Sequence, residues 1–218
     1  AIFDCWQNDT RLDFQGRFYR HTLMTPMFNP GPNAHGIPPI MLGALGPKMT
    51  EVAGEVADGL IVHPFNSMPF LLDRALPAVQ RGLEKTGRDR ADFILQVNSI
   101  VITGEDDAAI DAATEIVKGL LGFYASTPAY NPPMEAVDYG DLQPELNRLS
   151  KEGRWEELGQ YIDDDFLDAF TTRGTPQEVG GMLRDKYGDH ADRLAIYAPY
   201  AAPDAMWQKV ISDLKAPA

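Results

Sequence analysis

The chain has 218 residues, of which 44% are apolar and 23% are charged, and its formal net charge at pH 7 is −13. This composition is typical of a globular protein and excludes a disordered chain, and the lack of an apolar run of about 18 residues excludes a transmembrane helix. The excess of acidic side chains disfavours nucleic acids and anionic membranes as partners. The single cysteine, Cys5, excludes an intrachain disulfide and favours a reducing compartment, so we expect a cytoplasmic protein with a small-molecule partner.

Residues 1–39 carry signals for a helix, a hairpin and a loop. Residues 1–7 are largely apolar and have no capping residue before them, which predicts the last turns of a helix. Two short alternating runs surround Gln15-Gly16 and predict a small hairpin. Five prolines between residues 25 and 39 each fix the backbone and remove a hydrogen-bond donor, so we expect an irregular surface loop there.

From residue 40 the sequence alternates between short apolar strands and amphipathic helices. Strands are predicted at residues 40–42, 60–63 and 93–103. The helix after the first strand opens at Gly46-Pro47, and the helix after the second runs from Ser67 to Thr86 with a kink at Pro77. The helix after the third strand is expected to be capped by Asp106 or Asp107.

The alternation is interrupted between residues 125 and 172. Helical pieces are predicted at 141–149 and at 155–170. The second piece carries the acidic run 163–165, for which we expect a solvated face rather than a metal site, because neighbouring residues of a helix point in different directions. Beyond it, Thr175-Pro176 predicts a helix start with proline in the first position, and a fourth strand and a last helix are predicted at 193–197 and 204–214.

Four strands that are each followed by a helix predict a parallel α/β fold. Two architectures fit this pattern, an open doubly wound sheet and one half of a (β/α)8 barrel, whose usual full size is about 250 residues. The turn after the first strand reads Gly43-Ala44-Leu45-Gly46-Pro47-Lys48 and lacks the G-x-G-x-x-G spacing of dinucleotide-binding sheets. The pattern therefore favours the half barrel.

An ordered set of motifs resembles the bacterial luciferase-like flavin and deazaflavin oxidoreductases. The motifs at 14–19, 38–47, 57–59, 76–79 and 194–200 read FQGRFY, PPIMLGALGP, ADG, LPAV and LAIYAPY. Those at 123–130, 153–155 and 174–179 read FYASTPAY, GRW and GTPQEV, and they are similar to the branch that uses coenzyme F420. Together they extend over nearly the whole chain.

The resemblance implies a TIM barrel with a late insertion, of which this chain would hold only the second half, strands five to eight. The chain would then be a single incomplete barrel domain, with a hairpin and proline-rich loop at 1–39, three βα units at 40–124, an insertion at 125–172 and the last helices and strand at 173–218. The implied reaction is hydride transfer between coenzyme F420, or alternatively FMN, and a small organic substrate. An FMN enzyme of this kind could instead be a monooxygenase. The usual proton donors and acceptors would lie in the other half, so no catalytic residue is assigned.

The candidate cofactor-binding residues lie where strands end. In the turn 43–48, small residues and free N–H groups at a helix start would let a phosphate approach, with the lysine adding charge, although an ordinary tight turn explains the same sequence. His63 and Asn66 follow the second strand at the face where barrel enzymes keep their sites, and Asn98 interrupts the third. Structural hydrogen bonding is the alternative for each of these three. The predicted cofactor contacts are Gly43, Ala44, Leu45, Gly46, Pro47, Lys48, His63, Asn66 and Asn98.

Other polar and aromatic residues are given structural roles. Tyr197 and Tyr200 could line the pocket, but aromatic packing in the core is the default. Cys5 has no activating base nearby in sequence, and no histidine has partners at ligand spacing, so neither a reactive thiol nor a metal site is predicted.

Half a barrel would expose the edges of its first and last strands, and open strand edges recruit partners. We therefore expect a homo-oligomer or a partner chain that supplies the N-terminal half barrel. The alternative to an enzyme is a non-catalytic half-barrel subunit or remnant that assembles with itself or with a partner.

Overall fold

The computed structural model describes residues 1–216 and contains two compact units, Ala1–Ile40 and the part that begins at Met41. The first unit has a helix and a hairpin, as the sequence predicts, and a 3-10 turn within the proline-rich loop. Its elements are α1 (Ile2–Asn8), the antiparallel pair β1 (Phe14–Gln15) and β2 (Arg20–His21), and η1 (Pro26–Phe28). The thiol of the buried Cys5 donates to the carbonyl of Thr10 at 2.8 Å, which agrees with a structural role.

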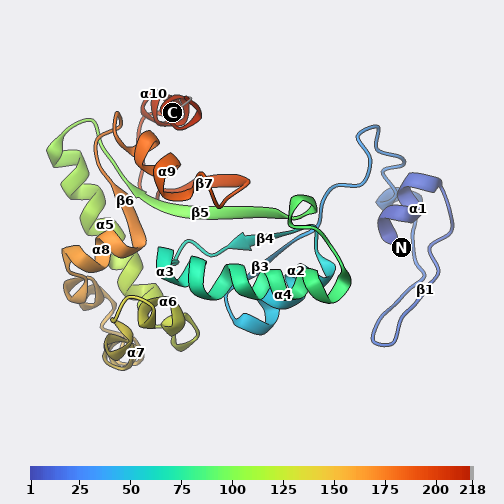
Figure 1. The fold of residues 1–218 in the computed structure, drawn as a ribbon, viewed down its shortest axis with the longest axis horizontal. Helices are drawn as coiled ribbons and strands as arrows, with labels where there is room; N and C mark the ends of the chain where they lie inside the picture. The colour runs from blue at the N-terminus through green and yellow to red at the C-terminus, as the bar shows by residue number, and fades with distance from the viewer. Residues whose placement is uncertain (217–218) are drawn as a thin grey trace. The chain divides into compact units, whose positions relative to one another are not determined.

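The second unit alternates strands and helices and then inserts a helical segment (Figure 1). Its first part is β3 (Met41–Ala44), α2 (Pro47–Val56), β4 (Gly59–Val62), α3 (Met68–Phe70), η2 (Leu71–Ala75), α4 (Leu76–Thr86), η3 (Arg90–Asp92), β5 (Ile94–Ile102) and α5 (Asp107–Ala125). The inserted segment holds η4 (Pro128–Tyr130), α6 (Asn131–Glu135), η5 (Gly140–Leu142), α7 (Gln143–Lys151), η6 (Trp155–Tyr161) and α8 (Asp164–Phe170). The chain then forms β6 (Thr171–Arg173), α9 (Val179–Tyr187), β7 (Arg193–Tyr197) and α10 (Asp204–Lys215). None of the helices in residues 1–216 combines the length and the apolar character needed to cross a membrane.

All strands of the second unit run parallel, which confirms the α/β prediction. β3, β4, β5 and β7 pair in chain order, unlike the 3-2-1-4 order of a dinucleotide-binding sheet. Ile100 of β5 pairs with Thr171 of β6 and with Tyr197 of β7, so these two strands lie on opposite edges of β5. Within the described residues the sheet does not close into a barrel, because β3 and β7 each pair along one edge only.

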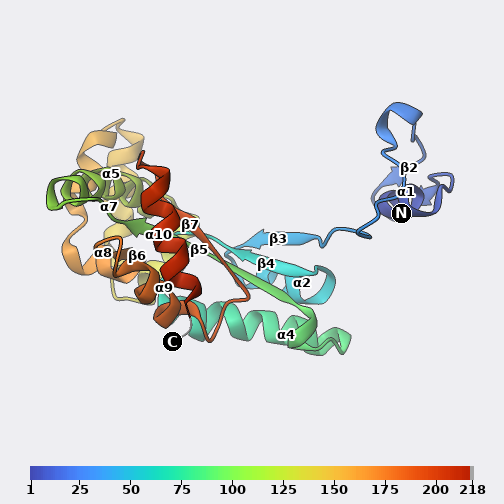
Figure 2. The same cartoon turned by 90° about the horizontal axis from the view of Figure 1, so that it is seen from above.

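Two apolar clusters hold this unit together. One lies between the sheet and α2, α4, α9 and α10, and includes Leu60 and Leu95 from the strands and Leu83 and Leu183 from the helices. The other joins the last residues of β5 to α5, α7 and α8, which gather at the end of the sheet where β5 leads into α5 (Figures 1 and 2). The insertion is therefore packed over the carboxyl end of β5.

The helix between β4 and β5 departs from the predicted kinked helix. It starts at Ser67, whose hydroxyl accepts the N–H of Phe70, and it ends at Gly87 in the left-handed conformation, both as predicted. Between them the helix widens to a π-turn over Leu71–Ala75. The ring of Pro77 would collide with the carbonyl four residues earlier, that of Asp73, and the wide turn at that point removes the conflict.

The other differences lie around the insertion. The predicted helix at 155–170 is a 3-10 helix followed by α8, which begins only after Asp163 because that carboxylate caps it through the N–H of Phe166, at 2.8 Å. The acidic run at 163–165 was predicted to form a solvated face. In the structure it also starts α8, with Asp163 as the cap and the next two aspartates in the first turn. β6 was not predicted. The helix expected from Thr175-Pro176 begins at Val179, because Thr175 and Glu178 first form a capping turn.

We predict that Gly82→Ala destabilises the protein by about 1–3 kcal/mol, because a Cβ there would collide with the carbonyl oxygen of Glu51 where α4 crosses α2. The matched control is Gly119→Ala in α5, where a Cβ meets no atom within 4 Å. That change should stabilise the protein by about 0.5–1 kcal/mol, since alanine favours a helix interior. Urea unfolding of both variants measures this, and equal effects would contradict the close helix crossing.

Candidate functional site

A cavity of about 350 Å³ lies where β3 and β4 end. It brings together several of the predicted residues, namely Gly43 and Ala44 from the end of β3, Leu45 from the turn after it, His63 just beyond β4, and Asn98 from β5. The other residues that line it are Ile61, Pro64 and Tyr130. Gly46, Pro47, Lys48 and Asn66 do not line it, although they are its neighbours in sequence.

The turn after β3 leaves open space beside its backbone. Gly43 and Gly46 both lack positive φ angles, so their conformations do not require glycine. A Cβ added at either position would meet no atom within 4 Å, so packing does not require glycine either. Both positions are exposed, and a ligand could therefore approach the main chain here.

The start of α2, which follows this turn in the chain, has unused hydrogen-bond donors. Gly46 is the N-cap and gives no side-chain hydrogen bond, and Pro47 occupies the first turn. The N–H and the hydroxyl of Thr50 both bind the carbonyl of Gly46 at 3.0 Å. This leaves the N–H groups of Lys48 and Met49 without acceptors inside the helix, and the Lys48 side chain beside them is exposed. Such an arrangement attracts anions.

His63 is held as a neutral hydrogen-bond donor. Its Nδ1 accepts the backbone N–H of Phe65 at 3.1 Å, so the neutral ring carries its proton on Nε2. Burial lowers the pKa of the imidazole from its usual 6.5. The ring packs against Tyr130 and Tyr124 with centroid distances of 4.7 and 5.0 Å. The side chain thus has a fixed position, and the Nε2–H is its remaining hydrogen-bond donor.

Tyr130 lines the cavity but was not among the predicted contacts, and the same holds for Ile61 and Pro64. Tyr130 lies in η4 at the beginning of the insertion, and the insertion is tied to the loop after β4 by a hydrogen bond from the hydroxyl of Ser67 to the carbonyl of Pro133, 3.1 Å long. The neighbouring Tyr124 is kept protonated, because burial and a hydrogen bond with Tyr197 raise its pKa. No spacing rule within the sequence marks Tyr130, since only the folded insertion brings it to the cavity.

The two asparagines differ in their partners. Asn98 lies on the partly exposed face of β5, and its Oδ1 accepts the side-chain amide of Gln96 at 3.2 Å. Asn66 is only 2% exposed, and within residues 1–216 neither its Nδ2 nor its Oδ1 has a hydrogen-bond partner. Leaving a buried amide unpaired costs about 1–3 kcal/mol, so Asn66 retains unused capacity to bind a polar group.

Tyr197 and Tyr200 do not line the cavity. The hydroxyl of Tyr200 accepts the N–H of Thr103 at 2.9 Å and donates to the carbonyl of Val101 at 3.0 Å, which joins the segment after β7 to the end of β5. Its role is therefore structural. Over residues 1–216 the structure contains no group of three or more histidine, cysteine, aspartate or glutamate side chains that could hold a metal ion.

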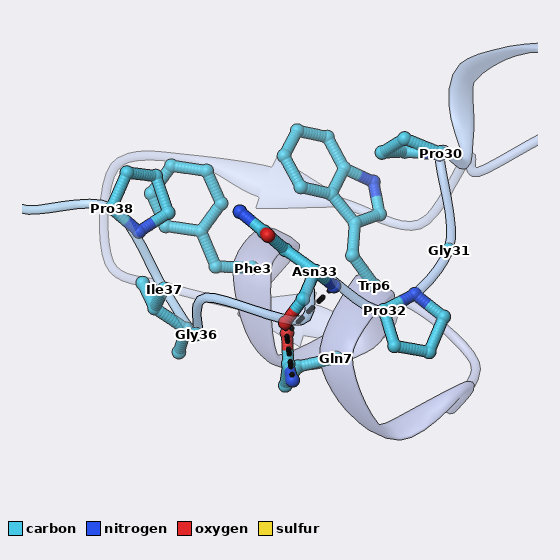
Figure 3. Close-up of a pocket in the computed structure, with 10 residues that line it drawn as sticks. All are labelled: Phe3, Trp6, Gln7, Pro30, Gly31, Pro32, Asn33, Gly36, Ile37 and Pro38. Carbon is cyan, nitrogen blue, oxygen red and sulfur yellow. Dashed lines mark hydrogen bonds between the residues drawn. The ribbon is translucent and has the colours of Figure 1, made fainter.

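The N-terminal unit has a cavity of its own, about 340 Å³ in volume (Figure 3). Phe3 and Trp6 of α1 line it together with residues of the proline-rich loop. The side chain of Gln7 forms two hydrogen bonds with the backbone of Asn33. Its amide nitrogen donates to the Asn33 carbonyl at 3.2 Å, and its amide oxygen accepts the Asn33 N–H at 3.1 Å. The cavity is apolar and includes none of the predicted cofactor contacts.

Comparison with known proteins gives the following matches. The sequence profile described as luciferase-like monooxygenase matches residues 1–193. An uncharacterised protein of Mycobacterium tuberculosis is 44% identical over 194 residues, which make up 89% of this chain and 57% of that protein. A 5,10-methylenetetrahydromethanopterin reductase of Archaeoglobus fulgidus is 27% identical over 142 residues, which make up 65% of this chain and 42% of that protein.

A solved structure shares the fold. The coenzyme F420-dependent tetrahydromethanopterin reductase of Methanopyrus kandleri superimposes with a TM-score of 0.71 over 97% of this chain and 58% of that chain, at 19% identity. At this identity the likeness shows the fold alone. The matches span about half the length of these proteins, from 42% of the Archaeoglobus reductase to 58% of the Methanopyrus reductase.

We predict that His63 makes the protein less stable in mild acid. Because its pKa in the folded state lies below 6.5, the unfolded chain takes up the proton first, and stability falls as the pH drops from 6.5 through the folded value. His63→Phe should therefore lose less stability than the wild type between about pH 7.5 and pH 5.5 in urea unfolding. His35→Gln, at an exposed position, is the control, and an identical loss in all three proteins would contradict the neutral assignment.

Proposed function

Because the chain belongs to the luciferase-like monooxygenase family, we propose that it serves an oxidoreductase that moves a hydride between coenzyme F420 and a small organic substrate. The observation that carries this proposal is the cavity at the ends of β3 and β4, which is lined both by Gly43, with open space beside its backbone, and by His63, whose Nε2 carries the proton. The structural relative that matches over 97% of this chain is an F420-dependent reductase, which favours F420, and FMN is the alternative cofactor.

The residues present fit such a cofactor. F420 and FMN both carry a phosphate and a flat ring system, and the ring supplies the hydride chemistry when the cofactor is bound. The free N–H groups at the start of α2 and the Lys48 side chain would hold the phosphate. His63 would donate to an oxygen of the ring, and Asn98, which also lines the cavity, would offer further hydrogen bonds.

We further propose that β3, β4, β5 and β7 are strands five to eight of a barrel. Three observations support this assignment. The four strands pair in parallel and in chain order, an insertion precedes β7, and the chain covers about half of each relative. The half that is not in this sequence would then supply the catalytic acid or base. We also propose that the edges of β3 and β7 pair with a second copy or with another polypeptide, and we place the assembly in the cytoplasm.

The alternative is a non-catalytic half-barrel subunit. It is favoured by the free edges of β3 and β7 and by the partly exposed face of the sheet at Ile61, Gln96 and Asn98. Cofactor binding separates the two functions, because only the first requires it.

We expect saturable binding of F420, followed by absorbance or fluorescence, when the chain is combined with a polypeptide that carries the first half barrel. Gly43→Ala should weaken this binding about tenfold without lowering the thermal midpoint, because the added methyl fills space that the ligand needs. Gly119→Ala is the control, and FMN is titrated in parallel. If neither cofactor binds the combined chains, the enzyme proposal is wrong and the assembly subunit remains.

We also expect the purified chain to self-associate or to bind the other half barrel, because unpaired strand edges seek partners. Light scattering and thermal unfolding test this together. A sharp monomer peak with a cooperative melt, unchanged by the added half barrel, would contradict it.

A further inference from the structure

A second polar cavity lies between α8, β6 and α9, separate from the one described above. Its volume is about 370 Å³, and it shares no lining residue with the cavity at Gly43 and His63. The residues that line it are Asp168, Thr171, Thr172, Arg173, Met182 and Lys186.

Lys186 places a partly buried ammonium group at this cavity without a direct counter-ion. Its Nζ donates to the carbonyl of Thr171 at 2.9 Å and lies 5.6 Å from the ring centroid of Tyr187. In the part of the chain that the structure describes, no carboxylate oxygen lies within 4.0 Å of this nitrogen. An ammonium has three donors, and buried charges in proteins are normally paired, so two donors of Lys186 await an acceptor.

The neighbouring charges do not meet this need. The guanidinium of Arg173 already donates to Oδ1 of Asp164 at 3.1 Å and to Oδ1 of Asp168 at 3.3 Å. Asp168 is the carboxylate that acts on Lys186, by raising its pKa, but burial lowers that pKa more strongly. The positive charge at this cavity is thus only partly balanced.

The two threonines add unused hydrogen-bond donors. Thr171 and Thr172 are each 3% exposed, and among residues 1–216 neither hydroxyl oxygen has a hydrogen-bond partner. Because side chains alternate along a strand, Thr171 projects from the same side of β6 as Arg173. At one cavity a buried hydroxyl without a partner and an ammonium with two unused donors both call for an acceptor.

We propose that this cavity binds a small oxyanion, a phosphate group or a carboxylate, through the ammonium of Lys186 and the hydroxyl of Thr171. An oxyanion offers only acceptors, which matches the unused donors, and it supplies the missing negative charge. Because the protein as a whole carries a net charge of −13, local donors and not the overall field must hold such a ligand.

The test titrates the 218-residue chain with inorganic phosphate and, separately, with acetate, at ionic strength held constant with potassium chloride. The thermal midpoint and, for phosphate, the 31P linewidth report binding. We expect saturable binding of at least one of the two anions, and the comparison shows whether a phosphate or a carboxylate is preferred. Binding of neither anion would overturn the proposal.

Variants locate the site. Lys186→Met keeps the aliphatic stem and should weaken binding at least about tenfold, while Lys186→Arg should retain most of it. Thr171→Val keeps the shape of the side chain and should also weaken binding, which gives a second measure if Lys186→Met does not fold. Lys209→Met is the control, since Lys209 is paired with Asp213 at 3.0 Å and lies outside the cavity. Unchanged binding in both Lys186→Met and Thr171→Val, or an equal loss of binding in Lys209→Met, would place the anion elsewhere and overturn the proposal.

Discussion

The parallel pairing of β5 is the interaction on which the second unit depends. This strand pairs with β4 over residues 94–97, with β7 over residues 96–100 and with β6 over residues 100–102. Three strands from distant parts of the sequence therefore share one partner, and each crossover between them must pass through a helix. The position of the cavity follows, because it opens where strands in this register end.

Alternation along β4 and β5 gives the sheet two different faces. Leu60 and Leu95 are buried beneath the helices, whereas Ile61, Gln96 and Asn98 on the other face remain partly exposed. Parallel sheets are normally covered by apolar layers on both sides. The polar side chains at 96 and 98 show that this second face is suited to polar contacts, and it is the face on which the cavity opens.

The sequence predicted those features that short-range patterns determine. β7 and the cap at Asp106 follow from apolar alternation and capping chemistry, and the place of Gly43 and His63 in the wall of one cavity follows from their positions near strand ends. β6 reads Thr-Thr-Arg, which carries no strand pattern, and it becomes a strand because it pairs with the end of β5. Tyr130 was missed for a similar reason, since its place at the cavity depends on how the insertion folds.

The two regions of this acidic chain for which we propose anion binding differ in their physical basis. Lys48 is exposed, so mobile ions screen its charge, and its contribution to binding must weaken as salt rises. Lys186 is partly buried at a cavity lined by Thr171 and Thr172, whose hydroxyls have no partner within residues 1–216, so screening there would be weaker and hydrogen bonds would decide the affinity of the proposed site. Net charge therefore does not reveal where an anion can bind. The more informative property is a buried donor whose acceptor the folded chain does not provide.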